Sequence, residues 1–243
     1  MSTLLLRFAA PIQSWGSTSR FQWRGTSREP TKSAVIGMLA AALGRRRTEP
    51  IDDLTEIEFG VRIDQPGRVI RDFQTAKSAD GKLAFISNRD YLSDAVFLVG
   101  IQASDEQLQV YEQALLHPYY PLFLGRRSCP PTQPFVLGIR SGKSLVEALK
   151  DEPWQASGFH QKRFQRQLQI SLEIVADVRY GAPNSYTQRD VPVSFDQTYR
   201  QYATRSVIRH SHDVPITTAG ADTASATATT TATEHDALAA LEE

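Results

Sequence analysis

The chain has 243 residues, of which 41% are hydrophobic and 22% are charged, as is typical of a soluble globular protein. No apolar run approaches the roughly 20 residues of a membrane helix, and no cationic leader precedes the first apolar residues. The single cysteine, Cys129, excludes an internal disulfide. These features predict a cytoplasmic protein that does not bind a membrane.

The formal net charge of zero conceals an uneven distribution of charge. Five of the 27 acidic residues lie in residues 219–243, a segment without lysine or arginine, so the rest of the chain carries a net charge of +5. Its cations are 21 arginines and six lysines. Arginine suits phosphate binding and stacking on bases. A codon bias toward arginine explains the same composition equally well, so composition alone assigns no ligand.

A long loop separates the first predicted strand from the first predicted helix. Residues 4–9 form an apolar run that predicts a strand, and residues 10–30 follow without a regular pattern. Connections of this length are more often functional than not. Trp15 and Trp23 alternate here with arginines, a combination that can stack bases and bind phosphates. The alternative is that both tryptophans fill the core.

Residues 31–44 predict one buried helix. Thr31 is the expected N-cap, apolar residues recur at helical spacing, and Gly44 marks the end. Lys32 and Ser33 lie in the first turn beside free backbone N–H groups, an arrangement that favours an anion. The alternative is an ordinary core helix with a polar first turn.

The next segment predicts a hairpin inserted between two strands of the sheet. Residues 57–63 and 95–99 read as half-buried and buried strands. Between them, residues 69–75 and 83–86 have strand patterns, and Asp80 and Gly81 supply a turn signal. The basic residues of this hairpin are Arg68, Arg71, Lys77, Lys82 and Arg89.

A second helix and a further strand complete the first half of the chain. Residues 104–107 form a capping box that opens the helix, and His117 with Pro118 ends it. Residues 119–131 predict an ordered loop because they contain glycine and three prolines, and residues 135–139 predict a strand. Strand, helix, strand, strand, helix, strand is the order of a ferredoxin-like domain.

The predicted fold is therefore α+β. Residues 1–140 are expected to form a ferredoxin-like domain with residues 64–93 as an inserted β-hairpin, and a ferredoxin-like sheet with a basic hairpin suits RNA binding. Residues 141–218 are expected to form a smaller β-rich part packed on that domain, although residues 179–213 have no clear pattern. The Ala- and Thr-rich residues 219–243 predict a disordered tail because they lack large apolar side chains.

No motif in the chain predicts catalysis, a metal or a cofactor. Gly142, Lys143 and Ser144 resemble the end of a phosphate-binding P-loop, but the preceding glycine is not at the required spacing. His210 and His212 lack nearby cysteines or a compact acidic set that would complete a metal site. The chain does contain the histidines, tyrosines and lysines of a metal-free ribonuclease, without a diagnostic spacing.

Four blocks of the sequence resemble the Cas5 family, in the CasD type found in the type I-E CRISPR surveillance complex Cascade. The blocks are residues 7–16, 30–44, 89–97 and 121–130. The resemblance spans residues 4–135 and fades after about residue 140. It implies a ferredoxin-like (RRM-related) RNA-binding domain whose protruding hairpin, residues 64–93, is called a thumb, and a subunit that holds the 5′ handle of the CRISPR RNA. It also implies contacts with the backbone subunit and the large subunit of the complex.

The resemblance to the type I-E form implies a non-catalytic subunit in antiviral defence, since a different subunit cuts the precursor RNA there. In type I-C relatives the corresponding subunit is itself the nuclease, so a metal-independent CRISPR RNA endoribonuclease is the alternative. The expected RNA-binding residues are Gln13, Lys32, Ser33, Arg71, Lys77, Arg89, Arg126 and Arg127.

Overall fold

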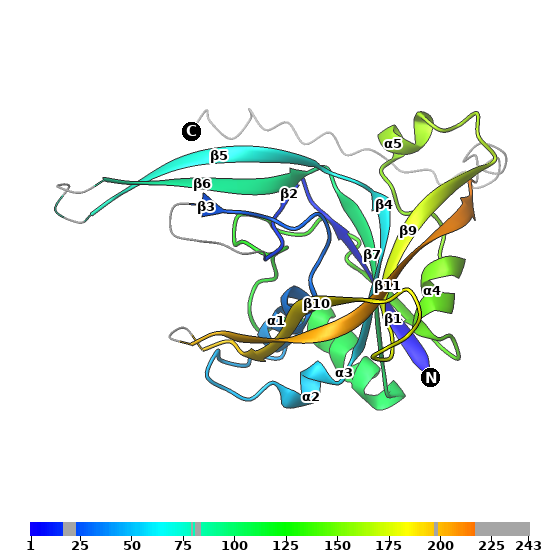
Figure 1. Ribbon diagram of the computed structural model, residues 1–243, viewed down its shortest axis with the longest axis horizontal. Coiled ribbons are helices and arrows are strands. Elements are labelled where there is room, and N and C mark those ends of the chain that lie inside the picture. Colours follow the sequence, from blue (N-terminus) through cyan, green and yellow to red (C-terminus); the bar gives the residue numbers. More distant parts are fainter. Residues whose placement is uncertain (17–22, 79, 81–83, 197–198, 217–243) are drawn as a thin grey trace, which may run out of the picture.

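The computed structural model describes residues 1–16, 23–78, 80, 84–196 and 199–216 (Figure 1). Its strands are β1 (Ser2–Ala9), β2 (Ile12–Gln13), β3 (Trp23–Arg24), β4 (Glu58–Gln65), β5 (Arg68–Lys77), β6 (Ala84–Ser93), β7 (Val96–Ala103), β8 (Val136–Arg140), β9 (Gln169–Asp177), β10 (Tyr186–Ser194) and β11 (Gln201–Pro215). Its helices are α1 (Lys32–Ala42), α2 (Asp52–Thr55), α3 (Asp105–Leu116), α4 (Leu145–Asp151) and α5 (Gly158–Lys162). The described part of the chain is thus a mixed α+β protein.

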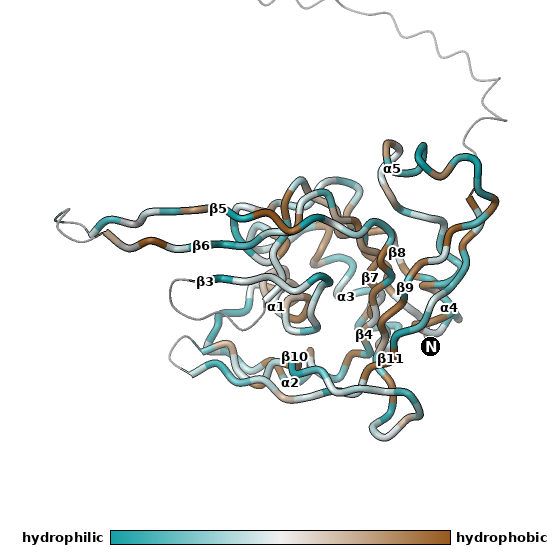
Figure 2. The backbone as a smooth tube through the Cα atoms, turned by 45° about the horizontal axis from the view of Figure 1, so that its top comes forward, coloured by the Kyte–Doolittle hydropathy of each residue, from teal (hydrophilic) through white to brown (hydrophobic). Residues whose placement is uncertain are grey.

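A seven-stranded sheet in the order β10-β11-β9-β4-β7-β1-β8 forms the centre of the molecule. Helices α1, α2 and α3 lie on one side of it and α4 on the other (Figure 1). Successive residues of β1 point to opposite faces, so Leu4 and Leu6 pack in the larger core with α1 and α3, whereas Leu5 packs against α4. The central strands around the labels β4, β7 and β8 are accordingly hydrophobic (Figure 2).

Helix α4 approaches the sheet closely at Gly100 of β7. A Cβ atom at this position would lie 2.7 Å from Leu145 Cδ1, so a larger residue would displace the Leu145 side chain. The contact fixes α4 on the sheet. No helix within the described residues is long and apolar enough to cross a membrane.

The order of the first elements agrees with the sequence prediction. β1, α1, β4, β7, α3 and β8 follow one another as strand, helix, strand, strand, helix and strand. Both predicted helix starts are present: Thr31 Oγ1 accepts from Ala34 N, and Ser104 with Gln107 forms a capping box before α3. Local side-chain chemistry therefore determines where both helices begin.

The predicted hairpin is present and longer than its sequence pattern indicated. β5 and β6 pair antiparallel from Arg68 opposite Ser93 to Lys77 opposite Ala84, and the hairpin projects from the molecule (Figure 1). Of the two residues expected to form the turn, Asp80 is described and Gly81 lies outside the described residues. On its other side β6 pairs with β2 and β3, both of which come from the long loop at residues 10–30.

The C-terminal strands extend the central sheet. β9 pairs with β4, β11 with β9 and β10 with β11, so residues 169–215 continue the same sheet. The sequence predicted a β-rich part packed on the first domain and left residues 179–213 unassigned. In the structure β9 pairs with β4 of the first domain, so the two parts share one sheet. The predicted tail at residues 219–243 lies outside the described residues.

Candidate nucleic-acid interface

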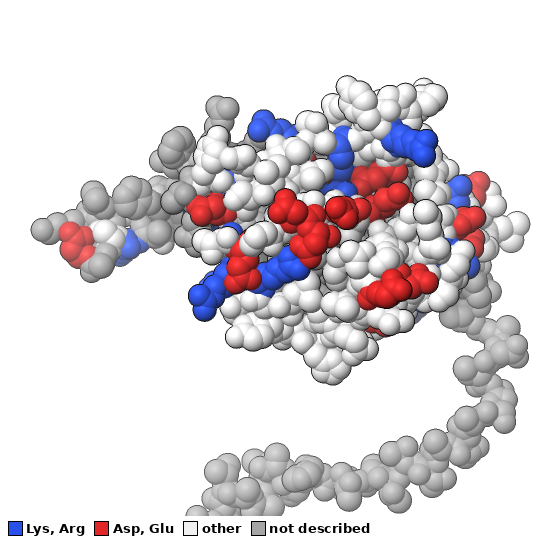
Figure 3. Space-filling view, turned by 90° about the horizontal axis from the view of Figure 1, so that it is seen from below, with Lys and Arg blue, Asp and Glu red and all other residues white. Residues whose placement is uncertain are grey.

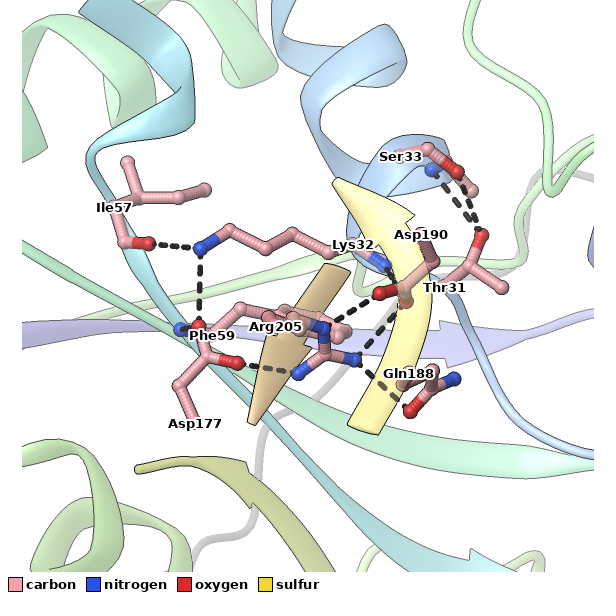
Figure 4. A network of polar contacts seen from close by, with 10 residues as sticks. Thr31, Lys32, Ser33, Ile57, Phe59, Asp177, Gln188, Asp190 and Arg205 are labelled. Atoms are coloured by element: carbon pink, nitrogen blue, oxygen red, sulfur yellow. Dashed lines mark hydrogen bonds and ion pairs between the residues drawn. The ribbon is translucent and has the colours of Figure 1, made fainter. Parts of the chain in front are cut away.

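The start of helix α1 is occupied by a carboxylate of the protein itself (Figure 4). Lys32 N donates to Asp190 Oδ2 at 2.9 Å. Lys32 Nζ donates to Ile57 O at 2.6 Å and to Asp177 Oδ2 at 3.0 Å, and the residue is only 6% exposed. Both groups thus have carboxylate partners within the fold, Asp177 for the Lys32 ammonium and Asp190 for the helix start, which argues against the predicted contact with RNA phosphate.

Arg205 of β11 completes this buried network. Its guanidinium donates to both oxygens of Asp190 and to Asp177, and it lies 5.1 Å from the ring centroid of Phe59. The two carboxylates thus receive N–H groups from α1, β4 and β11. Their role is to join the C-terminal strands to the helix. Ser33, next to Lys32, stays partly exposed with its hydroxyl 3.2 Å from Thr31 Oγ1.

Gln13 is also a structural residue. Its side chain is fully buried, and Nε2 donates to Ala95 O at 2.7 Å. The amide thereby joins β2 to the start of β7. Its complete burial argues against the predicted contact of Gln13 with RNA.

The base of the hairpin carries a compact group of three side chains. Asp90 of β6 accepts from Arg71 Nε of β5 at 3.0 Å and from Trp23 Nε1 of β3 at 3.1 Å. The Arg71 guanidinium carbon lies 4.0 Å from the Trp23 ring centroid. A carboxylate that is 11% exposed thus orients an arginine and a tryptophan that remain about half exposed.

The opposite face of the same three strands carries two arginines side by side. Arg24 of β3 lies in register with Arg89 of β6. On the other side of β6, Arg89 lies in register with Asp72 of β5. Arg89 Nε donates to Ser87 Oγ at 3.3 Å, and neither arginine forms an ion pair within the described residues. Like charges in adjacent positions repel, so this pair favours an anion between or above the two guanidinium groups.

The loop that carries Arg126 and Arg127 is held rigidly against the hairpin base. Gly125 has φ +91°, and a Cβ atom there would lie 1.5 Å from Ser14 O, so only glycine fits. Arg126 donates to Asp90 O at 3.1 Å and to Arg24 O at 2.8 Å. Arg126 is therefore a structural link between the loop, β6 and β3, whereas its neighbour Arg127 is exposed.

Other predicted residues lie apart from this base. Lys77 is exposed at the far end of β5, where no ion pair involves it in the described part of the chain. Cys129 is fully buried at the end of the arginine loop, and burial raises the pKa of its thiol. It is therefore unsuited to be a nucleophile.

Within the described residues the histidines lie in three separate places: His117 at the end of α3, His160 in α5, and His210 with His212 in β11. His160 of α5 packs against Trp154 and Phe164, and burial lowers its pKa. His210 and His212 lie on β11, and burial also lowers the pKa of His210. Within the described ranges no group of three His, Cys, Asp or Glu side chains could hold a metal ion.

The underside of the molecule in the view of Figure 1, near α2 and α3, is acidic rather than basic. Helices α2 and α3 begin with Asp52, Asp53, Asp105 and Glu106, and a band of acidic side chains crosses this face (Figure 3). Such a surface repels phosphate. The arrangement leaves the base of the hairpin, with Arg24, Arg89 and Arg127, as the better site for a polyanion.

The sequence reasoning missed what holds this site together. Asp90, which orients Arg71 and Trp23, was not singled out because a lone acidic residue in a strand has no distinctive pattern. Arg205 was missed because residues 179–213 showed no periodicity. The alternation of tryptophans and arginines in residues 10–30 did signal Trp23 and Arg24, although not which strand they join.

Comparison with known proteins gives a consistent assignment. Residues 3–208 match the family described as CRISPR-associated protein (Cas_Cas5). The chain is 37% identical over 169 residues to the CRISPR system Cascade subunit CasD of Escherichia coli (strain K12), which covers 61% of this chain and 75% of that protein.

Two solved structures resemble the whole fold. A chain of a "CRISPR RNA-guided surveillance complex" superimposes with a TM-score of 0.72 at 31% identity, covering 88% of this chain and 91% of that chain. A "Crystal structure of Cas protein" gives a TM-score of 0.66 at 34% identity, with coverages of 88% and 95%. The chain belongs to the Cas5 family of CRISPR-associated proteins, as its four sequence blocks predicted.

Proposed function

We propose that this protein is the CasD-type subunit of a type I-E Cascade complex and holds the 5′ handle of the CRISPR RNA at the base of its hairpin. In this proposal β1, α1, β4, β7, α3 and β8 form a ferredoxin-like RNA platform and β5 with β6 is its thumb. The observation that carries it is the Arg24–Arg89 pair, two adjacent cations that form no ion pair within the described residues, even with Asp72 in register beside Arg89.

The support beneath these arginines favours RNA binding. Both arginines lie on paired strands, β3 and β6. The Arg126 side chain joins these strands because it donates to a backbone carbonyl of each. A side chain on a rigid support loses less conformational entropy on binding than one on a mobile segment. Arginine also binds phosphate through two parallel hydrogen bonds. Arg127, exposed next to the anchored Arg126, supplies a third cation.

The hairpin is also the proposed contact with the backbone and large subunits. Its apolar side chains Val69 and Ile70 are 48% and 43% exposed, although the protein has a large core in which such residues are usually buried. Replacing residues 70–86 by a short Gly/Ser turn should leave the body folded and reduce retention of the subunit in the complex. Normal retention with normal RNA protection would refute this assignment.

The test of RNA binding compares variants of the partly buried Arg89 and of the exposed Arg127. Arg89→Ala, or Arg127→Ala, should weaken binding of handle RNA and make the salt dependence shallower by about 0.7 per lost phosphate contact. Neither change should lower the melting temperature. Arg47→Ala is the matched control, since Arg47 is exposed and forms no hydrogen bond or ion pair within the described residues. Unchanged affinity and salt slope in both variants would remove the hairpin base from the RNA site.

The subunit is proposed to be non-catalytic. The described histidines lie in three separate places, and two of them have pKa values lowered by burial, which disfavours the imidazolium form of a general acid. Incubating the full chain with precursor repeat RNA in EDTA should leave the RNA intact. Cleavage at one site, abolished by a single His or Tyr substitution, would establish the alternative, a metal-independent endoribonuclease.

A further inference from the structure

Three exposed or half-buried side chains form a row across the hairpin base, on the face opposite the Arg24–Arg89 pair. Trp23 of β3 is in register with Asn88 of β6, and Asn88 is in register with Phe73 of β5. Residues in register on adjacent strands point to the same face of a sheet. The row therefore presents an aromatic ring, an amide and a second aromatic ring, with Trp23 44% and Phe73 62% exposed.

Trp23 does not fill the core, whereas the other tryptophan of the same loop does. Trp15 is fully buried and stacks on Phe8 with the ring centroids 5.5 Å apart. Burial of a large aromatic ring is strongly favourable, so an exposed tryptophan beside an exposed phenylalanine indicates a binding surface. The two halves of the loop thus have different roles.

The orientation of Trp23 is fixed before any ligand binds. Asp90 uses one carboxylate oxygen for Trp23 Nε1 and the other for Arg71 Nε. The Arg71 guanidinium carbon lies over the indole, 4.0 Å from the ring centroid. A flat group that is already oriented loses little entropy when a second flat group stacks on it.

We propose that this row, which we call the Trp23 row, binds unpaired bases of single-stranded RNA, with one base stacked on the Arg71–Trp23 pair and another on Phe73. Asn88 lies between the two rings, and its amide can donate and accept hydrogen bonds at a base edge. Its side chain has no hydrogen-bond partner among the residues described. The inference rests on the proposed RNA-binding function. It adds contacts with bases to the phosphate contacts of the Arg24–Arg89 pair.

RNA fits the Trp23 row better than an apolar protein surface does. Arg71 is 52% exposed at its side chain and stands over one aromatic ring, and Asn88 separates the two rings. A protein partner of apolar character would have to cover a guanidinium and an amide without compensating hydrogen bonds, which is costly. Guanidinium and indole faces both stack on bases.

The test compares two single-stranded RNA octamers with the same phosphates, oligo(rA) and an octamer with abasic sugars at its four central positions. The full chain should bind oligo(rA) more tightly and show quenching of Trp23 fluorescence. Trp23→Ala should lose about 5- to 150-fold in affinity for oligo(rA) and leave binding of the abasic octamer and the salt slope unchanged. Trp23→Phe should retain most of the preference for bases while it loses the quenching.

Two further variants distinguish a loss of base stacking from a loss of folding. Phe73→Ala removes an exposed side chain from the hairpin and should reduce the preference for oligo(rA) without lowering the melting temperature. Phe159→Ala is the matched control, since Phe159 is 80% exposed on α5, away from the hairpin.

The outcomes separate the two proposals. Equal binding of both octamers by the unsubstituted chain, unaffected by Trp23→Ala and Phe73→Ala, would overturn the Trp23 row and leave phosphate binding intact. Absence of binding to either octamer would overturn both proposals. An effect of Phe159→Ala as large as that of Phe73→Ala would also overturn the Trp23 row.

Discussion

Replacing Lys32 by methionine tests whether the start of α1 is a structural or an RNA-binding site. Methionine preserves most of the length of the side chain and removes its charge. The change deletes the hydrogen bond to Ile57 O and the ion pair with Asp177. Breaking a buried ion pair costs about 3–5 kcal/mol. We expect about 3 kcal/mol, since Asp177 keeps Arg205 and Phe59 N as partners.

For a chain of this length, a loss of about 3 kcal/mol lowers the melting temperature by about 6–12 °C. Calorimetry of the full chain measures this shift, and Lys77→Met, at an exposed lysine, is the control that should not melt earlier. In a double-mutant cycle, Asp177→Asn should cost less in the Lys32→Met background than in the native chain. An unchanged melting temperature with a salt slope shallower by about 0.7 would refute the reasoning and return Lys32 to the RNA site.

Three other predictions address pH, the thiol and the tail. Burial lowers the pKa of His160 and His210, so the unfolded chain binds protons that the folded chain does not. Urea titrations should therefore show the free energy of unfolding falling as the pH is lowered from about 7.5 to about 5.5. The fall should be smaller in His210→Gln. Because Cys129 is buried with a raised pKa, DTNB should modify it only in denaturant, and rapid labelling of the folded chain would contradict its burial. Truncation after Thr218 should leave melting and RNA binding unchanged, since residues 219–243 lack core-forming side chains; loss of either would give the tail an ordered role.

The sequence by itself determined the elements whose signals are local. The capping residues Thr31 and Ser104 predicted both helix starts because an N-cap acts on N–H groups two or three residues away. The alternating strands around residues 57–63 and the turn signal of the hairpin were likewise visible, since side-chain period and turn chemistry depend on neighbouring residues. The family blocks added the identity of the fold, which periodicity could not supply.

The role of each charged residue was decided only by the tertiary structure. Lys32 has a sequence context that suits phosphate binding, but Asp177, 145 residues away, pairs with its ammonium group, and Asp190, 158 residues away, accepts from its backbone N–H. Arg126 and Arg127 are adjacent and chemically identical, yet Arg126 donates to three backbone carbonyls and Arg127 faces solvent. A charge binds a ligand only if its own fold has not already neutralised it, and the partners that do so come from distant strands whose pairing no local pattern encodes.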